Sequence, residues 1–464
     1  MPSSVAKLYE HSASELAGLI ASRQVSSREA VEAHLARIKA VNGYVNAVTV
    51  VLEETALEAA DAADRGPILG PLHGVPFTVK ESIDCLGSAT TLGVPALKRA
   101  YPSLEAPAVA RMKAAGAIPI GRTNLSEFGM RLGASNPLRG ATLNPWSPGL
   151  TPGGSSGGDA AALATGMTPF GLGSDMGGSL RFPAYCCGIA ALKPTAGRIA
   201  VARSLEPLDF GIALQTMLVE GPMARTVADL HLGLAVLAGR DIRDPRSVDA
   251  PLTGPHAAKR AALATHIPGV EIHPVTLEAI RRAGRILADN GWDVEEAGPP
   301  ELEGASETWG RLMAIDLSAT LNGVRPMLSD PLAGYLTRLC RYFDVGKMPN
   351  LAMHAARSRL ARIWSGFFAE YPVMIGPNCA GLPWAVDADL DPEYGLGMLL
   401  DATRFLIPGS LLGMPSLALP MGIVDRLPTG IQIHADLWRE DLCLDAAKVI
   451  ESGMERSTPI DPIW

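Results

Sequence analysis

Two glycine-rich stretches decide how this 464-residue chain is organised: Thr-Pro-Gly-Gly-Ser-Ser-Gly-Gly-Asp at residues 151–159 and Gly-Leu-Gly-Ser-Asp-Met-Gly-Gly-Ser-Leu-Arg-Phe-Pro at residues 171–183. Glycine lets the backbone adopt conformations closed to other residues and come close to a ligand. Because a run of glycines costs folding entropy, it usually has a local reason to exist. Helix-like stretches follow both clusters, so backbone N–H groups there can face a developing negative charge. The two stretches therefore indicate the two halves of a hydrolytic site.

Composition favours a globular protein that works without nucleic acid or a membrane. The chain is 47% hydrophobic and 19% charged, and its length predicts one large or two fused domains. A formal net charge of −8 without any block of Lys and Arg argues against a nucleic-acid partner. Residues 1–19 lack the pattern of a signal peptide, and no uninterrupted apolar run reaches the roughly 18 residues of a membrane helix.

The cysteines predict an intracellular setting rather than a disulfide or metal framework. The six cysteines are scattered, without a C-x-x-C pair or a metal-ligand spacing. We expect free, buried thiols in a reducing cytoplasm. Cys186 and Cys187 are adjacent, but we interpret them as small core residues rather than as a redox pair or a nucleophile.

Helical and strand patterns alternate along the chain. Residues 11–65 are predicted to be helical, with a capping box formed by Ser26 and Glu29. The apolar run 75–79 predicts a short buried strand that ends on Lys80. Further strands are predicted at 117–120, 168–172, 373–375, 416–419 and 430–433, and further helices at 108–115, 159–165, 222–237, 274–290 and 440–451. The alternation indicates an α/β fold: a single large domain over 1–464, with a mixed, mostly buried central sheet flanked by helices.

The region 240–400 differs from the rest. It opens with a stretch rich in Asp, Pro and Arg at 240–255, which indicates a surface connection. We predict that 240–400 is a variable region that covers the site. Its aromatic side chains either line a substrate pocket or pack in the core: Trp309, Tyr335, Tyr342, Trp364, Tyr371, Trp384 and Tyr394.

Lys80 is the preferred base for a serine nucleophile. A serine hydroxyl needs a base within hydrogen-bond reach and donors for the oxyanion. Of the nine histidines, only His73 lies in a loop-rich setting, and it precedes the end of the strand by several residues. Lys80 follows a strand without other charges, and burial lowers a lysine pKa from about 10.4 by up to 3–5 units. The alternative is a lysine that reaches solvent or pairs with Glu81.

These residues stand in motifs whose order and spacing resemble the amidase signature family. The motifs are Gly-Val-Pro-Phe-Thr-Val-Lys-Glu at 74–81, Gly-Arg-Thr-Asn at 121–124, Pro-Gly-Gly-Ser-Ser-Gly-Gly at 152–158, Gly-Ser-Asp-Met-Gly-Gly-Ser-Leu-Arg-Phe-Pro at 173–183 and Leu-Lys-Pro-Thr at 192–195. The resemblance is tight over a signature core at 69–197 and weaker at 221–225, 413–416 and 430–432. The region 240–400 carries little of it.

The resemblance implies a Ser-Ser-Lys triad. Ser179 would be the nucleophile, Ser155, on a cis peptide bond, would relay the proton, and Lys80 would be the terminal base. The backbone N–H groups of Met176, Gly177, Gly178 and Ser179 would form the oxyanion hole. Gly129 falls where relatives line the acyl pocket and suggests room there. No metal and no organic cofactor are implied.

Neighbouring residues of the motifs have more than one interpretation. Ser156 either bonds a helix N-terminus or takes a secondary part in the proton network. Asp175 and Arg181 are expected to support the loop that carries Ser179 rather than to react. Asp159 departs from the family pattern, in which a small residue is common at this position.

Three rival functions stay open at this point. Residues 153–157 formally match the G-x-S-x-G elbow of α/β-hydrolases, which would make Ser155 the nucleophile of an esterase with His434 as base, although 144–152 is loop rather than strand. The chain could also be the ammonia-producing subunit of a tRNA-dependent amidotransferase, or a non-catalytic interaction protein. The preferred prediction is an amidohydrolase that cleaves a small-molecule carboxamide to a carboxylate plus ammonia or an amine through an acyl-enzyme on Ser179. A homodimer is the default expectation for its assembly.

Overall fold

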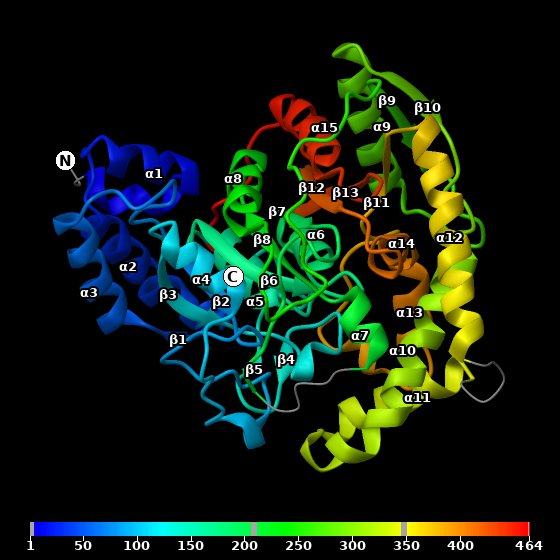
Figure 1. The fold of residues 1–464 in the computed structure, drawn as a ribbon, viewed down its shortest axis with the longest axis horizontal. Coiled ribbons are helices and arrows are strands. Elements are labelled where there is room, and N and C mark those ends of the chain that lie inside the picture. Colours follow the sequence, from blue (N-terminus) through cyan, green and yellow to red (C-terminus); the bar gives the residue numbers. More distant parts are fainter. Residues whose placement is uncertain (1–3, 206–210, 345–349, 463) are drawn as a thin grey trace.

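A mixed sheet of eleven strands forms the centre of the computed structural model, which describes residues 4–205, 211–344, 350–462 and 464. The strand order is β1-β3-β2-β6-β8-β7-β12-β13-β11-β9-β10 (Figure 1). The strands are β1 Val48–Val51, β2 Pro76–Lys80, β3 Ile118–Thr123, β6 Phe170–Asp175, β7 Ala190–Lys193, β8 Val219–Ala224, β9 Arg260–Leu263, β10 Asp293–Glu296, β11 Val373–Pro377, β12 Ser416–Val424 and β13 Leu427–His434. A separate hairpin joins β4 Ser135–Asn136 to β5 Gly140–Ala141.

The sheet contains both parallel and antiparallel pairs, and helices flank it. β2 pairs in parallel with β3 and β6, whereas β6–β8, β7–β8, β7–β12 and β12–β13 are antiparallel. The helices are α1 Ala13–Ala21, α2 Ser27–Val45, α3 Glu53–Arg65, α4 Pro107–Ala114, α5 Gly157–Ala164, α6 Arg181–Cys187, α7 Ile212–Met217, α8 Val227–Leu237, α9 Pro274–Asp289, α10 Leu302–Val324, α11 Asp330–Tyr342, α12 Asn350–Glu370, α13 Gly395–Ala402, α14 Ile407–Leu411 and α15 Glu440–Ser452. The predicted α/β fold with a mixed, mostly buried sheet is confirmed.

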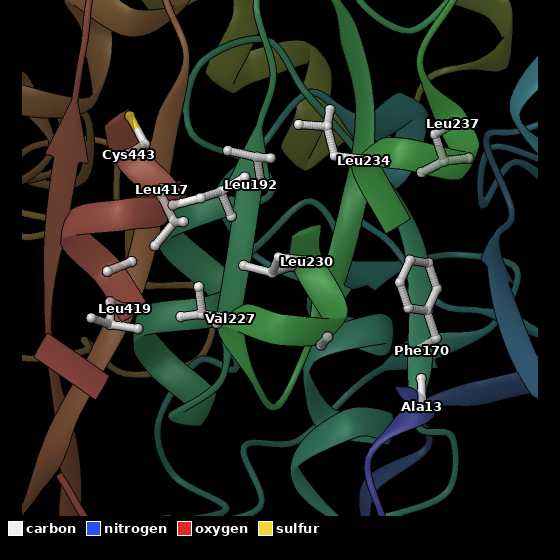
Figure 2. Packing of buried hydrophobic residues seen from close by; sticks show 14 of the residues in the cluster. Ala13, Phe170, Leu192, Val227, Leu230, Leu234, Leu237, Leu417, Leu419 and Cys443 are labelled. Carbon is white, nitrogen blue, oxygen red and sulfur yellow. The ribbon is translucent and has the colours of Figure 1, made fainter. Parts of the chain in front are cut away.

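Two apolar clusters cover the two faces of the sheet. On one face, α8 and α15 pack against β6, β7 and β12; Figure 2 shows Leu230 and Leu234 of α8 beside Leu192 of β7. The other face packs mainly against α2, α5 and α6. Because side chains alternate along a strand, Phe77 and Val79 point into the first cluster. Lys80 therefore points to the other face, toward α5 and α6.

Local sequence signals explain most element boundaries, and two expectations were wrong. The capping box of Ser26 and Glu29 is present at the start of α2. The range 11–65, however, contains the strand β1, because the β-branched residues at 48–51 pair with β3. The helix expected at 222–237 begins only at Val227, since residues 219–224 form β8 between β6 and β7.

The long helices of the region 240–400 lie to one side of the sheet. In Figure 1, α10 and α11 lie below α13 and α14, and α12 runs beside them at the right of the view. Apolar side chains of α10 and α11 form their own cluster, which includes Leu317, Leu332 and Leu336. Residues 345–349 of this region lie outside the described residues. Within the described chain, no helix combines the length and apolar character needed to cross a membrane.

The packing of α8 gives a test of this arrangement. Leu230 is fully buried against the sheet, so Leu230→Ala removes apolar contacts and leaves a cavity. We expect this variant to lower the free energy of unfolding by about 2–5 kcal/mol, measured by chemical denaturation. His231→Ala, at the next, exposed position of the same helix, is the matched control and should change stability little.

Candidate active site

Lys80 is buried among hydroxyl groups at the end of β2. Its side chain is 0% exposed. The Nζ donates hydrogen bonds to Ser155 Oγ at 2.7 Å, Ser156 Oγ at 2.8 Å and Ser174 Oγ at 3.0 Å. The alternative pairing with Glu81 does not occur, because Arg139 lies 2.9 Å from that carboxylate. The ammonium group is therefore enclosed by neutral acceptors rather than paired in a direct salt bridge.

The surroundings of Lys80 change its proton affinity. Burial, which disfavours the charged form, lowers the pKa of Lys80 to about 7, although the carboxylates of Asp159 and Asp175 oppose the shift. An amine with this pKa is about half neutral at pH 7. It can therefore accept a proton from a neighbouring hydroxyl group at neutral pH.

Ser155 is held by a close approach of two backbone segments. The peptide bond between Gly154 and Ser155 is cis, as the resemblance implied. A Cβ atom on Gly154 would lie 1.7 Å from the carbonyl oxygen of Gly133, so only glycine fits there. Gly129, with a φ of +70°, faces the same serine: a Cβ atom on it would lie 3.4 Å from Ser155 Oγ.

Ser156 joins the proton network and does not cap the helix. It stands at the N-cap of α5 but makes no side-chain capping bond. Its hydroxyl accepts from Lys80 and donates to the Ser174 carbonyl oxygen at 3.3 Å. The interpretation as a helix-capping side chain was therefore wrong. The reason is that a buried ammonium binds a hydroxyl oxygen more strongly than a backbone N–H does.

Sequence reasoning missed Ser174. This residue lies in β6, whose neighbour in the sheet is β2, and its hydroxyl is the third acceptor for Lys80. The available signal was a polar side chain near the end of an otherwise apolar strand. That signal does not distinguish a ligand of Lys80 from an ordinary strand-end serine.

Asp175 and Arg181 hold the loop that carries Ser179. The Asp175 carboxylate accepts hydrogen bonds from the N–H groups of Gly178 at 2.8 Å and Leu180 at 3.1 Å. Arg181 forms a bidentate pair with it, both distances being 3.0 Å. Burial alone would raise the pKa of Asp175, but the adjacent guanidinium outweighs it and lowers that pKa to about 2. The supporting role predicted for both residues is confirmed.

The hydrogen bond of Gly178 changes one expectation for the oxyanion hole. Its N–H group points to Asp175, so it is not free to meet a ligand. Met176, Gly177 and Ser179 line the cavity described below. These three members of the expected set of donors therefore fit the role better than Gly178 does.

Ser179 and Ser155 lie on the same cavity. The two glycine-rich loops are joined directly, since Ser156 N–H donates to the Ser179 carbonyl oxygen at 3.2 Å. Ser155, Ser174 and Ser179 all line the cavity wall. Within the described chain, no hydrogen bond connects the hydroxyl groups of Ser155 and Ser179. The first half of the expected relay, from Lys80 to Ser155, is thus a direct hydrogen bond. For the second half, from Ser155 to Ser179, the two serines line the same cavity without a hydrogen bond between their hydroxyl groups in the described chain.

The cavity is large, and most of its wall is apolar. It has a volume of about 420 Å³. The three serines and Gly129 lie on its wall, and the charged residues Asp84, Arg131, Arg203 and Asp316 line it as well. Its apolar lining comes from α7, α10, α11 and α13, from residues that adjoin these helices and from residues 92–132. It includes Leu92, Phe128, Leu132, Leu214, Leu218, Trp309, Met313, Leu317, Leu321, Leu328, Tyr335, Leu336, Leu339, Leu399 and Leu400. The mostly apolar lining indicates a site for a molecule with an apolar body.

Buried polar contacts fix the cavity wall. Arg131, which follows the lining residues Gly129 and Met130, pairs with Asp389 at 2.7 Å and with Asp387 at 2.6 Å. Asp316 of α10 accepts from the N–H of Ala213 in α7 at 2.6 Å. Trp309 Nε1 donates to the Met176 carbonyl oxygen at 3.2 Å. The wall built by the region 240–400 is therefore tied to the serine loops.

The other candidates from the sequence lie away from the cavity. His434 is buried between Ser416 Oγ at 2.8 Å and Gln432 Nε2 at 2.8 Å, and burial lowers its pKa to about 3. His73 contacts backbone atoms of Leu69 and Ala63. These surroundings give no support to an elbow mechanism with His434 as base.

Cys186 and Cys187, together with Trp364 and Trp384 of the region 240–400, are packed in the core. Cys186 and Cys187 are fully buried, and burial raises the pKa of both thiols. Of the aromatic set, Trp309 and Tyr335 line the cavity, whereas Trp364 packs in the core. In the described residues, no three or more His, Cys, Asp or Glu side chains gather in a way that could hold a metal ion.

Known proteins share both the sequence pattern and the fold. A family model described as Amidase matches residues 29–444. The indoleacetamide hydrolase of Bradyrhizobium diazoefficiens is 38% identical over 457 residues, which cover 96% of this chain and 87% of that protein. A glutamyl-tRNA(Gln) amidotransferase subunit of Salinispora arenicola is 32% identical over 490 residues, covering 97% and 98%. The structure of a 6-aminohexanoate cyclic dimer hydrolase with its substrate superposes with a TM-score of 0.85 at 26% identity, covering 98% of this chain and 99% of that one.

The close approach at Gly154 gives a test of the site geometry. Gly154→Ala places a methyl group against the Gly133 backbone, which cannot move like a flexible side chain. We expect this variant to lose more than about 3 kcal/mol of stability, measured as a fall in the midpoint of chemical denaturation. Gly149→Ala is the matched control, because no atom lies within 4 Å of the added carbon. Equal stability of the two variants would contradict the geometry.

Proposed function

Since the chain belongs to the amidase signature family and is an enzyme that hydrolyses amide C–N bonds, we propose that Ser179 is its nucleophile, with Ser155 as proton relay and Lys80 as base. The observation that carries this proposal is the buried Lys80 amine, which contacts Ser155 at 2.7 Å. Ser155 in turn lies on the cavity that Ser179 lines. Catalytic hydrogen bonds are often long in the free enzyme and shorten when substrate binds. We therefore expect the hydrogen bond between Ser155 and Ser179 to form in the substrate complex.

The reaction follows from these contacts. Ser179 Oγ attacks the amide carbonyl carbon, its proton passes to Ser155 Oγ, and the Ser155 proton passes to Lys80 Nζ. The C–N bond then breaks, and the proton returns from Lys80 through Ser155 to the leaving nitrogen. Water attacks the resulting ester on Ser179 by the same route. The products are a carboxylic acid and ammonia or an amine, and Lys80 ends neutral as it began.

The oxyanion of each tetrahedral intermediate needs donors at the cavity wall. We assign this role to the backbone N–H groups of Met176, Gly177 and Ser179. Gly178, whose N–H donates to Asp175, instead keeps the loop in shape. Gly129 leaves room beside Ser155 for the acyl group.

The preferred substrates are primary amides with an apolar acyl group, either aryl or aliphatic. Leucines and two aromatic side chains of α10 and α11 contribute to the wall, and they belong to the region 240–400 that we propose as the substrate-covering part of one domain. A relative at 38% identity is named for indoleacetamide, an amide with an apolar body. Ester cleavage is a side activity, because the mechanism does not require a nitrogen leaving group.

An ammonia-producing amidotransferase component is the second candidate, because a relative with such a name is 32% identical over 97% of this chain. Its amide donor, glutamine, has no apolar body, whereas the many leucines on the cavity wall favour an apolar acyl group. We therefore keep an amidase that acts in the cytoplasm on small molecules, without nucleic-acid or membrane partners, as the proposal, with a homodimer as its default assembly.

The pKa of Lys80 predicts the pH dependence. The neutral amine is the base, so kcat/KM should rise with pH through about 7 and then level off. Lys80→Met should lower kcat/KM by about 10²–10⁴-fold. Lys193→Met is the control: Lys193 is also buried with a pKa lowered by burial to about 7, and this variant should keep the rising limb. A Lys80→Met enzyme of normal activity would rule out the relay.

The apolar wall predicts the substrate preference. With ammonia detection, an arylacetamide and a medium-chain aliphatic amide should be cleaved more efficiently than glutamine. Leu321 of α10 lines the cavity, so Leu321→Gln should raise KM for the apolar amides about 10-fold. The exposed neighbour Asn322 supplies the control variant Asn322→Ala. Preference for glutamine over both apolar amides would favour the amidotransferase alternative.

A further inference from the structure

Asp159 is a buried carboxyl group that the proposed mechanism does not use. It lies in the first turn of α5. Its side chain is 0% exposed, and in the described chain neither carboxylate oxygen makes a hydrogen bond. Alanines occupy the next three positions of the helix. A carboxyl group left without hydrogen bonds in such a setting destabilises the fold, so a role in the chemistry would explain why it is there.

The strand register places Asp159 on the same side of the sheet as Lys80. Thr78 and Lys80 alternate with Phe77 and Val79, which point to the opposite cluster. Thr78 is paired with Gly171 of β6. A Cβ atom on Gly171 would lie 3.3 Å from Asp159 Oδ1, so the carboxyl group lies against this face.

The other charged groups around Lys80 have partners of their own. Asp175 is paired with Arg181 at 3.0 Å, and Glu220 of β8 faces Arg203. Arg122 of β3, which also faces Asp159, donates to backbone carbonyl oxygens, among them that of Ile83 at 2.6 Å. In the part of the chain that the structure describes, the Asp159 carboxylate forms no ion pair and no hydrogen bond with an adjacent cation.

We propose that Asp159 is a positioning residue for the amidase reaction: its buried carboxylate stabilises the ammonium form of Lys80 while that group holds the proton taken from Ser179 through Ser155. The inference depends on the proposed role of Lys80 as base. No bond to Asp159 forms or breaks, and the carboxylate acts only through its charge. Without it, the ammonium would be buried among neutral hydroxyl groups, and the amine would accept the proton less readily.

The mutual influence of the two groups supports this assignment. Burial raises the pKa of Asp159 to about 7, and the Lys80 charge opposes that rise, as does the Thr123 hydroxyl facing the carboxyl group. Asp159 in turn is the carboxylate that most strongly opposes the lowering of the Lys80 pKa. Each group thus favours the charged form of the other.

The test is the pH profile of kcat/KM for Asp159→Asn and Asp159→Ala on one apolar amide. Removing the negative charge destabilises the ammonium of Lys80, so the midpoint of the rising limb should move to lower pH by about one unit. The plateau should fall about 10-fold, because a weaker base transfers the proton less effectively. Asp445→Asn removes a carboxylate from an exposed position of α15 and controls for net charge.

Stability provides a readout that does not depend on catalysis. The folded-state pKa of Asp159 lies above its unfolded value of about 3.9, so the stabilisation from its protonated form is complete below that value and is lost as pH rises through about 7. Asp159→Asn should therefore gain stability relative to the native chain as pH rises from about 4 to about 7, and the difference should level off above that range.

Each outcome points one way. A lower midpoint in both Asp159 variants, with the Asp445→Asn profile unchanged, would support the positioning role. A midpoint that stays in place in folded, active Asp159 variants would overturn it, even if stability changes as described. Normal activity of Lys80→Met would instead show that the proposed base is wrong, whatever Asp159 does.

Discussion

The burial of one lysine among three serine hydroxyl groups is the interaction on which the site depends. Water would keep the Lys80 amine protonated, and a direct carboxylate contact would do the same. The fold avoids both: strand alternation turns Lys80 toward α5, and the nearest atoms are neutral oxygens. The pKa of Lys80 is thereby lowered, and the ammonium form can still exist in the site. The close approach of Gly154 and Gly133 serves the same end, because it brings Ser155 to the amine.

A second constraint fixes the position of the proposed nucleophile, Ser179, relative to that base. Asp175 and Arg181 are both fully buried and paired with each other. Asp175 holds the loop of Ser179 by hydrogen bonds to its backbone N–H groups. Arg181 also reaches the Leu406 carbonyl oxygen at 2.7 Å and Gln432 at 2.8 Å, so the loop is fastened to segments far away in the chain. Breaking a buried pair of this kind leaves an uncompensated charge. The position of the Ser179 loop thus depends on contacts with distant parts of the fold.

Sequence reasoning reached the centre of the site but not its edges. Lys80 and the support from Asp175 follow from charged residue types that are expensive to place in a core, whereas the role of Ser155 came from the family resemblance. Ser156 was misassigned in part, because a serine before a helix fits a cap as well as a lysine ligand. The donor status of Gly178 depends on where one carboxylate points, which no spacing encodes. The helices α10 and α11 offered only apolar periodicity, and that pattern is the same for a core helix and for a cavity wall.

The hydrogen bond from Ser156 N–H to the Ser179 carbonyl oxygen has a consequence for how such enzymes diversify. It couples the two reactive loops into one unit that rests on the sheet, while a large part of the apolar wall belongs to α10 and α11. Mutations in those two helices can therefore alter which molecules are admitted while the reacting groups keep their spacing. Selection can therefore change substrate specificity separately from the catalytic residues. New substrates can be accepted while the reacting groups stay unchanged.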